Sequence, residues 1–126
     1  MSREEKELLE IKEILRKCSN CGFCRSVCPV FKALRREGYS ARGRAFMLKN
    51  GKIDKDQIFC CTGCRACEIA CPNGVKLYDA ILKARRILAK KGDNTPSNNE
   101  MMKNVRKYGN PFGDRKKGVK DKYYCC

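Results

Sequence analysis

Eleven cysteines are the residues of this 126-residue chain whose type and spacing could do chemistry. Most of them fall into two runs that align without gaps, each closed by a proline. The runs are Cys18, Cys21, Cys24, Cys28 and Pro29, and Cys61, Cys64, Cys67, Cys71 and Pro72. This C-x2-C-x2-C-x3-C-P pattern is the bacterial-type ligand spacing for a [4Fe–4S] cluster, and two copies make a strong signal. The loop glycines, Gly22 and Gly63, stand at different offsets from the cysteines.

The spacing has a geometric reason. Three cysteines at short intervals wrap one face of a cubane cluster in a tight loop and leave one iron without a ligand. The fourth cysteine begins the next helix and points away from its own loop, and in two-cluster ferredoxins it binds the other cluster. We therefore predict crossed ligation. Cluster I takes Cys18, Cys21, Cys24 and Cys71, and cluster II takes Cys61, Cys64, Cys67 and Cys28.

Other uses of clustered cysteines fit this pattern less well. Structural zinc takes pairs of cysteines from two separated knuckles, and triplets followed by Cys-Pro do not divide into such pairs. A disulfide scaffold is disfavoured because the cysteine count is odd and the sequence shows no export signal. A further alternative stays open, in which the clusters are present but serve only to hold the fold together.

Three cysteines lie outside the repeat. Cys60 adjoins Cys61 and is either a spare thiol near cluster II or an alternative ligand, although only Cys61 keeps the full spacing. Cys125 and Cys126 have no partner in the local sequence. We expect Cys61 to be the ligand, and the roles of the other three thiols stay open.

The composition leaves little material for a hydrophobic core. Hydrophobic residues make up 42% of the chain, but that figure includes the cysteines. Without them, the apolar share falls to about one third, which is low for a globular domain. Crossed ligation of two clusters would supply the missing stability by tying the two halves of the chain together.

Absent residues and segments exclude several classes of protein. The sequence has no histidine, which excludes His-dependent catalytic triads, His-ligated zinc, haem with a proximal His and Rieske clusters. It has no apolar run long enough to span a membrane, and residues 1–10 lack the apolar segment of a secretory signal. Reduced thiols without an export signal favour the cytoplasm. No G-x-G-x-x-G motif indicates a flavin or nicotinamide site.

The chain is strongly basic, with 29 Lys and Arg against 14 Asp and Glu and a formal net charge of +15. Two clusters with their thiolates would lower this to about +11. Such an excess indicates a polyanionic or acidic partner. Arginines near the cysteines would favour the more negative, reduced clusters, although solvated surface positions explain them equally well. They are Arg25, Arg42, Arg44 and Arg65.

Helical periodicity runs through most of the chain and no segment shows sustained strand alternation, so the predicted fold is mostly α. The expected helices and helical turns cover about residues 3–17, 30–36, 41–49, 54–59, 76–90 and 98–108. N-terminal caps are expected at Ser2, Ser40 and Ser97. The clearest amphipathic helix is 76–90, with apolar residues at Leu77, Ile81, Ala84 and Leu88.

The sequence around and between the cysteine runs carries a family resemblance. Helical sequence fills the 33 positions from Cys28 to Cys61, where small ferredoxins with a β-hairpin scaffold place shorter, strand-rich sequence. Residues 39–44 look like the Ser-Pro-Arg-Gly-Arg segment of glycolate oxidase-type proteins, with Ala41 in place of the proline. Residues 61–68 are similar to their second cluster loop, and residues 109–113 to their Asn-Pro-hydrophobic-Gly segment.

Over about residues 15–113, the chain therefore resembles the α-helical ferredoxin domain, which has two [4Fe–4S] cluster-binding loops. That domain occurs in the C-type subunit of heterodisulfide reductase, in the iron–sulfur subunits of anaerobic glycerol-3-phosphate dehydrogenase and glycolate oxidase, and in the succinate dehydrogenase iron–sulfur protein. The last group carries an extra [2Fe–2S] domain that this sequence lacks. Larger relatives also continue into cysteine-rich CCG domains, so the resemblance implies that the catalytic domain is not in this sequence, which would be a separate small subunit, a split-gene product or a truncated piece.

We expect two parts in the chain. Residues 1–92 would form the two-cluster α-helical ferredoxin domain with its N-terminal helix. Residues 93–126 would form a linker, a short helix and a basic C-terminal tail.

The sequence thus predicts an electron-transfer subunit without catalytic residues, which relays single electrons within a heterodisulfide reductase-like or flavin dehydrogenase-like complex. The expected partner is a flavoprotein or a CCG-domain oxidoreductase subunit. One alternative is a free dicluster ferredoxin, which the basic charge disfavours because exchange ferredoxins are usually acidic. The other is a nucleic-acid-binding protein with structural clusters, whose basic residues 103–122 would neutralise phosphates. An aromatic content of 8% and the lack of a recognised nucleic-acid motif disfavour a nucleic-acid partner.

Overall fold

The computed structural model describes residues 1–114, so Cys125, Cys126 and most of the predicted basic tail lie outside the described residues. Over residues 1–114 all regular elements are helices, which confirms the mostly α prediction. They are α1 (Arg3–Ile14), α2 (Phe23–Ser26), α3 (Pro29–Leu34), the 3-10 turn η1 (Glu37–Tyr39), α4 (Ala41–Lys49), α5 (Lys55–Phe59), α6 (Ala66–Ala70), α7 (Leu77–Lys90) and α8 (Pro96–Tyr108).

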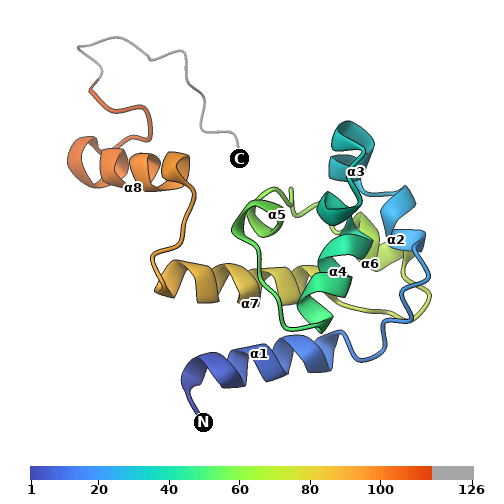
Figure 1. Cartoon of the computed structure of the whole chain (residues 1–126). Coiled ribbons are helices and arrows are strands. Elements are labelled where there is room, and N and C mark those ends of the chain that lie inside the picture. Colours follow the sequence, from blue (N-terminus) through green and yellow to red (C-terminus); the bar gives the residue numbers. More distant parts are fainter. Residues whose placement is uncertain (115–126) are drawn as a thin grey trace.

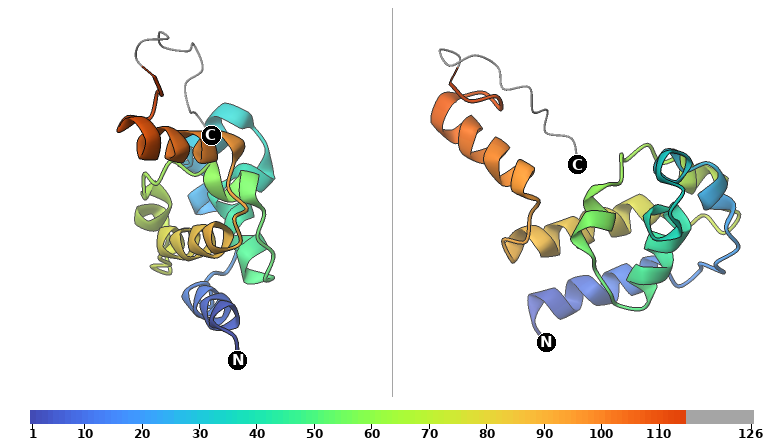
Figure 2. Two further views of the ribbon diagram at one scale, coloured as in Figure 1. Left: turned by 90° about the vertical axis from the view of Figure 1, so that its left-hand side faces the viewer. Right: turned by 45° about the horizontal axis from the view of Figure 1, so that its top comes forward.

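Figure 1 shows α1 and α7 lying side by side, with α4 packed against both. The views in Figure 2 agree. Three ion pairs join α1 to α7, between Glu4 and Lys91, Glu7 and Lys90, and Glu10 and Lys83. Because the residue number falls along α7 as it rises along α1, the two helices are antiparallel.

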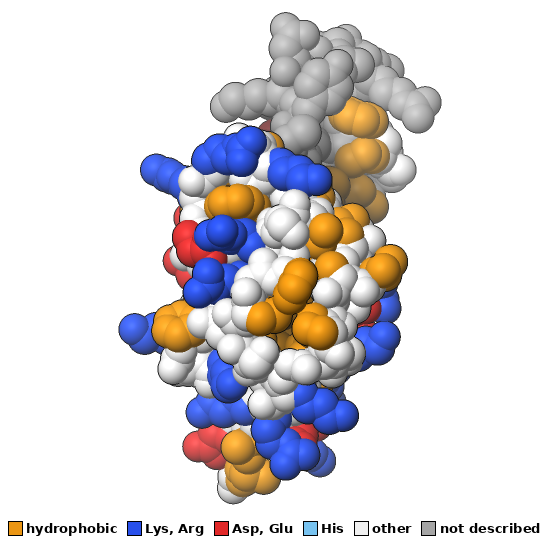
Figure 3. Space-filling view, turned by 90° about the vertical axis from the view of Figure 1, so that its right-hand side faces the viewer, with side chains coloured by type: hydrophobic (Ala, Val, Ile, Leu, Met, Phe, Trp, Pro, Cys, Tyr) orange, Lys and Arg blue, Asp and Glu red, His pale blue; other side chains and the backbone are white. Residues whose placement is uncertain are grey.

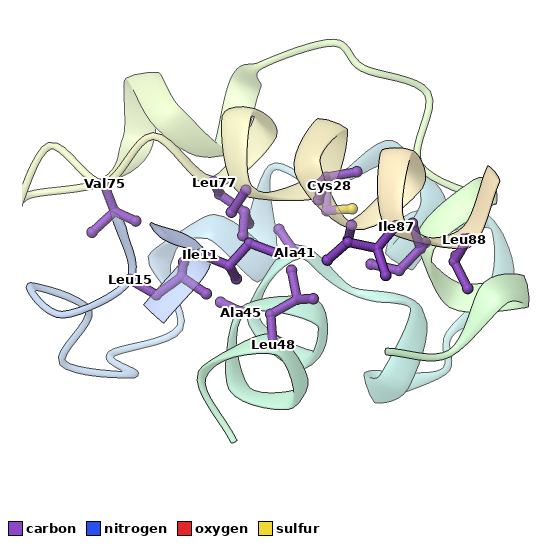
Figure 4. Close-up of a cluster of buried hydrophobic side chains, with 14 of the residues drawn as sticks. Ile11, Leu15, Cys28, Ala41, Ala45, Leu48, Val75, Leu77, Ile87 and Leu88 are labelled. Carbon is purple, nitrogen blue, oxygen red and sulfur yellow. The ribbon is translucent and has the colours of Figure 1, made fainter. Parts of the chain in front are cut away.

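The hydrophobic core lies where α1, α4 and α7 meet. Figure 4 shows Ile11 and Leu15 pointing toward Ala45 and Leu48 from the opposite helix. The four apolar positions predicted on the amphipathic helix are all buried, which confirms that pattern: Leu77, Ile81, Ala84 and Leu88. Cys28 is part of the same buried cluster, so the core reaches directly to the cysteine loops.

The predicted helix ends are close to those observed, with a few corrections. α4 has the predicted bounds, and the Ser40 cap is confirmed because its Oγ accepts a hydrogen bond from the Gly43 amide at 2.9 Å. α1 ends three residues early. At α8 the predicted cap is wrong. Thr95, and not Ser97, accepts from the Asn98 amide, because Pro96 takes the first helical position, where its fixed φ suits the start of a helix.

α8 lies apart from the other helices, beyond the turn that follows α7 (Figures 1 and 2). None of its side chains is buried. The division of the chain after residue 92 stays a prediction. No helix within residues 1–114 combines the length and the apolar character that crossing a membrane would require.

Candidate iron–sulfur site

The two cysteine loops lie at one end of the helix bundle, where α2 of the first loop packs against α6 of the second (Figure 1). The fourth cysteine of each run has nearly the same backbone conformation. Cys28 has φ −74° and ψ 117°, and Cys71 has φ −76° and ψ 117°. Both residues are therefore extended where their loops meet the following segment, and the repeat in sequence is also a repeat in backbone.

The different glycine offsets in the two loops also have a backbone explanation. Each loop needs two left-handed residues, two and four positions after its first cysteine. In the first loop they are Asn20, with φ 60°, and Gly22, with φ 90°. In the second they are Gly63, with φ 72°, and Arg65, with φ 58°. Each loop places glycine at one of the two positions, and a residue with a side chain bears the strain at the other.

The first cavity is lined by all four cysteines predicted for cluster I. Three come from the first loop, and Cys71 comes from the second. The cavity has a volume of about 320 Å³, including the space open to solvent at its mouth. Polar side chains of Asn20, Arg42 and Asn73 share the lining. The structure thus brings this predicted set together around one space.

Hydrogen bonds fasten the two loops to each other beside this first cavity. Asn73 Nδ2 donates to the Lys17 carbonyl at 2.9 Å and to Ser19 Oγ at 3.2 Å. The amide of Val75 donates to Cys71 Sγ at 3.4 Å. Asn73 follows Cys71 and Pro72, and its partners precede and follow Cys18. The two Asn73 bonds therefore hold the segment of the fourth cysteine against the loop whose cluster it is predicted to complete.

The second cavity is lined by all four cysteines predicted for cluster II. Here Cys28 comes from the first loop and the other three from the second. The volume, about 360 Å³ including open space, is close to that of the first cavity. Its remaining wall includes the apolar side chains of Val30, Leu77 and Ile81 and the guanidinium groups of Arg44 and Arg65. The Cys28 side chain is itself buried.

Residues of α6 and α7 shape the second loop. Glu68 Oε1 accepts from the Tyr78 amide at 2.9 Å, so its carboxylate caps the first turn of α7. The Arg65 guanidinium lies 4.9 Å from the centre of the Tyr78 ring and 3.5 Å from Asp79 Oδ1. Arg85 Nη2 donates to the Cys61 carbonyl at 2.6 Å. These contacts fix both ends of the loop to the long helix α7.

The segment Ser40–Arg44 lies between the two cavities. Arg42 lines the first cavity and Arg44 lines the second. Gly43 makes this possible because a Cβ atom there would lie 2.1 Å from the Glu37 carbonyl oxygen, so only glycine lets α4 approach η1 this closely. The prediction that these arginines lie near the clusters agrees with their positions. The solvated alternative is wrong for Arg44, which is 1% exposed.

One thiol in each cavity has a raised pKa, chiefly because it is buried. Burial raises the pKa of Cys24 to about 11, with a further contribution from Cys18 and Cys21. Burial likewise raises the pKa of Cys67 to about 12, and Cys61 adds to the effect. Thiolates are the form that binds metal. Four of them around one space therefore need a cationic centre such as iron.

Two further observations test whether the residues fit a cluster. Each set of four thiols lines one cavity, which fits a polynuclear cluster. In the wall of the second cavity, Arg44 Nη2 is buried without a hydrogen-bond partner, and an anionic cluster would satisfy it. The residues present therefore fit two iron–sulfur clusters.

Cys60 and Cys61 face different spaces. Cys61 lines the second cavity, whereas Cys60 lines a separate hollow with Tyr39 and Phe59. This arrangement favours Cys61 over Cys60 as a ligand. Sequence reasoning did not find Asn73, Glu68 or Arg85, because each acts through a contact remote in the sequence and no local pattern marks it.

Comparison with known proteins agrees with this geometry. Residues 14–75 match the family described as the 4Fe-4S dicluster domain. The chain carries a 4Fe-4S dicluster domain. The match confirms the predicted cofactors, which are two [4Fe–4S] clusters.

Curated relatives of the dicluster domain confirm the resemblance stated from sequence. The chain is 38% identical over 93 residues to the C-type iron-sulfur subunit of the CoB–CoM heterodisulfide reductase of Methanopyrus kandleri, covering 71% of this chain and 45% of that protein. It is 37% identical over 97 residues to the probable glycolate oxidase iron-sulfur subunit of Bacillus subtilis, covering 70% and 22%. The Escherichia coli glycolate oxidase iron-sulfur subunit is 35% identical over 96 residues, covering 71% and 24%. The chain thus spans less than half the length of these relatives.

Proposed function

We propose that this chain is an electron-transfer module of an oxidoreductase complex and has no catalytic residues of its own. The observation that carries the proposal is the pair of adjoining cavities, each lined by three cysteines of one loop and one of the other. When bound, two [4Fe–4S] clusters take up and release single electrons. The relatives named above are iron–sulfur subunits of heterodisulfide reductase and glycolate oxidase, which supports the same role.

The ligand sets in this proposal are the crossed ones. Cys18, Cys21, Cys24 and Cys71 hold cluster I, and Cys61, Cys64, Cys67 and Cys28 hold cluster II. Crossed ligation makes each cluster a covalent link between the two halves of the domain. The packing of α2 against α6 keeps the two cavities close, as electron exchange between them requires.

A partner surface accompanies the relay role. In and beside the cysteine loops, Phe23 is 61% exposed and Ile69 is 88% exposed, and Cys21 and Cys64 are also exposed. Figure 3 shows this end of the molecule, where hydrophobic side chains gather near the centre and Lys and Arg side chains lie around them. An apolar centre with a basic rim suits a partner whose redox centre lies beneath an apolar patch with acidic residues around it. We propose a flavoprotein or CCG-domain subunit as that partner.

Cluster content tests the cofactor and the relay. Anaerobically purified protein should contain about eight irons and eight sulfides per chain. Reduction with dithionite should give the EPR signals of two interacting [4Fe–4S]⁺ centres. Stoichiometric zinc without labile sulfide would contradict the proposal.

Salt dependence and paired variants test the docking face. The rate of electron exchange with a flavoprotein or CCG-domain subunit should fall as ionic strength rises, because screening weakens charge steering. Phe23→Ser and Ile69→Ser should weaken the complex and leave both clusters in place. Val105→Ser, at an exposed position on α8 (47%), is the control and should have no such effect. Equal losses of affinity for the partner in all three variants would show that Phe23 and Ile69 do not form the docking face.

A further inference from the structure

Arg44 is the only Lys or Arg within residues 1–114 that is buried. Its Nε donates to the Gln57 carbonyl at 2.6 Å, and its Nη1 lies 3.9 Å from Cys28 Sγ. Its Nη2 is buried with no hydrogen-bond partner, and no carboxylate in the described residues forms an ion pair with it. The guanidinium therefore faces the second cavity with its charge unbalanced.

A buried, unpaired arginine is expensive. Arginine keeps its positive charge in proteins, and a buried charge without a partner is strongly destabilising. The chain nevertheless holds Arg44 in place through the Gln57 carbonyl and through the close approach of Gly43 to η1. An anion in the cavity would stabilise such a position, and the cluster with its four thiolates is that anion.

The other arginines beside the cavities differ in both exposure and partners. The Arg42 side chain is 36% exposed, and its Nε lies 3.2 Å from Asn20 Oδ1 and 3.9 Å from Glu37 Oε1. The Arg65 side chain is 50% exposed and pairs with Glu68 and Asp79. Water and carboxylates therefore offset the charges of these two, whereas nothing in the described residues offsets that of Arg44.

We infer that Arg44 makes the cluster held by Cys28 and the second loop the more easily reduced of the two. This inference rests on the proposed function. Reduction adds one negative charge, and a desolvated cation stabilises that charge far more than a solvated, paired one does.

Three features act in the opposite direction, and each is weaker. The Glu68 carboxylate beside the second cluster loop is only 6% exposed, but Arg65 pairs with it and the Tyr78 amide donates to it, so its negative charge is offset. The apolar wall of the second cavity disfavours added charge, and the Val75 amide stabilises the other cluster through Cys71. The amide is a neutral dipole, however, and Arg44 carries a full charge in the same apolar wall that weakens screening. Arg44 therefore determines which of the two clusters has the higher midpoint potential, and without it the order of the two midpoints should reverse.

The test is an EPR-monitored redox titration of the anaerobic, cluster-loaded protein. The exposed ligands Cys21 and Cys64 provide the assignment, because Cys21→Ser and Cys64→Ser should each alter the signal of one cluster. In the wild type, the higher midpoint should belong to the cluster that Cys64→Ser alters. Arg44→Gln should lower that midpoint potential by at least about 59 mV, which is a tenfold change in the equilibrium constant for one-electron reduction. The midpoint of this cluster should then lie below that of the other cluster.

Matched variants separate charge from structure. Arg44→Lys keeps the charge and should change the equilibrium constant for reduction of the second cluster by less than threefold. Arg42→Gln and Arg65→Gln remove solvated, paired charges at the two cavities and should also shift it less than threefold. A merely structural role for Arg44 predicts that the Lys and Gln variants behave alike.

The outcomes distinguish this inference from the proposed function. Unchanged midpoints in Arg44→Gln with about eight irons retained would overturn the inference and leave the relay intact. Protein without clusters would overturn the relay itself. If the Arg44→Gln variant fails to hold iron, the midpoint potentials of the wild-type protein test the inference. A higher midpoint at the cluster whose signal Cys21→Ser alters would contradict it.

Discussion

The two cysteine loops of the dicluster domain have matching backbones and different surroundings. Cys28 and Cys71 agree within a few degrees in φ and ψ, and each loop has left-handed residues at the same two offsets. The first cavity nevertheless has polar side chains such as Asn20 and Asn73 in its wall. The second has apolar side chains such as Val30 and Leu77 in its wall, together with the buried guanidinium of Arg44 and the more exposed one of Arg65.

This difference teaches how one ligand pattern can give two unlike sites. The repeated spacing determines where the sulfur atoms lie, because it determines the course of the backbone. The helices outside the repeat determine charge and access to water. α7 supplies apolar residues to the second cavity, whereas the turn after Cys71 supplies Asn73 to the first.

The largest expected effect comes from replacing the fourth cysteine of either run with serine. Cys28→Ser should remove or alter the cluster of the second loop, and Cys71→Ser that of the first. Where the cluster is lost, iron should fall from about eight to about four per chain. Both changes should also weaken the whole fold, because each removes a covalent link between its halves. Metal analysis and EPR provide the measurement.

Crossed ligation would be wrong if Cys28→Ser disturbed only the cluster of Cys18, Cys21 and Cys24. Cys61→Ser serves as the reference for loss of the second cluster through a residue of its own loop.

Alanine at the two loop glycines should have unequal effects. Both positions have positive φ, so each substitution costs about 1–2 kcal/mol of backbone strain. A Cβ at Gly63 would also lie 2.9 Å from Tyr78 Oη, whereas one at Gly22 would lie 3.5 Å from the flexible Arg42 side chain. Gly63→Ala should therefore lower the Tm of the anaerobic protein more than Gly22→Ala does.

Removing the ring isolates the cause of this difference. In a Tyr78→Ala background, the Gly63→Ala change should cost no more than Gly22→Ala does in the wild type. An undiminished effect would show that Tyr78 is not responsible.

A smaller and more local effect is expected at the polar supports. Asn73→Ala removes the bonds to Lys17 and Ser19, and Glu68→Ala removes the cap on Tyr78. Each change should cost about 0.5–1.5 kcal/mol, the net worth of an ordinary hydrogen bond. Under an iron chelator, Asn73→Ala should lose cluster I faster, and Glu68→Ala cluster II. If the two clusters were lost in the same order in both variants, Asn73 and Glu68 would not support separate clusters.

The smallest expected effect is at Cys60. Because it lines a hollow separate from the second cavity, Cys60→Ser should leave iron content and EPR signals unchanged, and Cys61→Ser should not. Loss of a cluster in Cys60→Ser would move the ligand register by one residue.

The sequence by itself determined the ligand pattern and the main helices. Cysteine spacing and helical periodicity are local signals, and each residue has its meaning relative to neighbours a few positions away. α4 and α7 formed with bounds within one residue of those predicted, and the apolar face of α7 is buried. α2, α6 and η1 were not predicted because they are too short to show a period.

Only the tertiary structure decided what surrounds each cavity. Arg42 and Arg44 stand two residues apart in one short segment, and nothing local indicates that one keeps water while the other loses it. Arg44 is buried because α4 packs against α1 and α7, and because Gly43 lets it approach η1. Desolvation depends on atoms brought together from distant parts of the chain, so the charge that distinguishes the two sites emerges only when the helices pack.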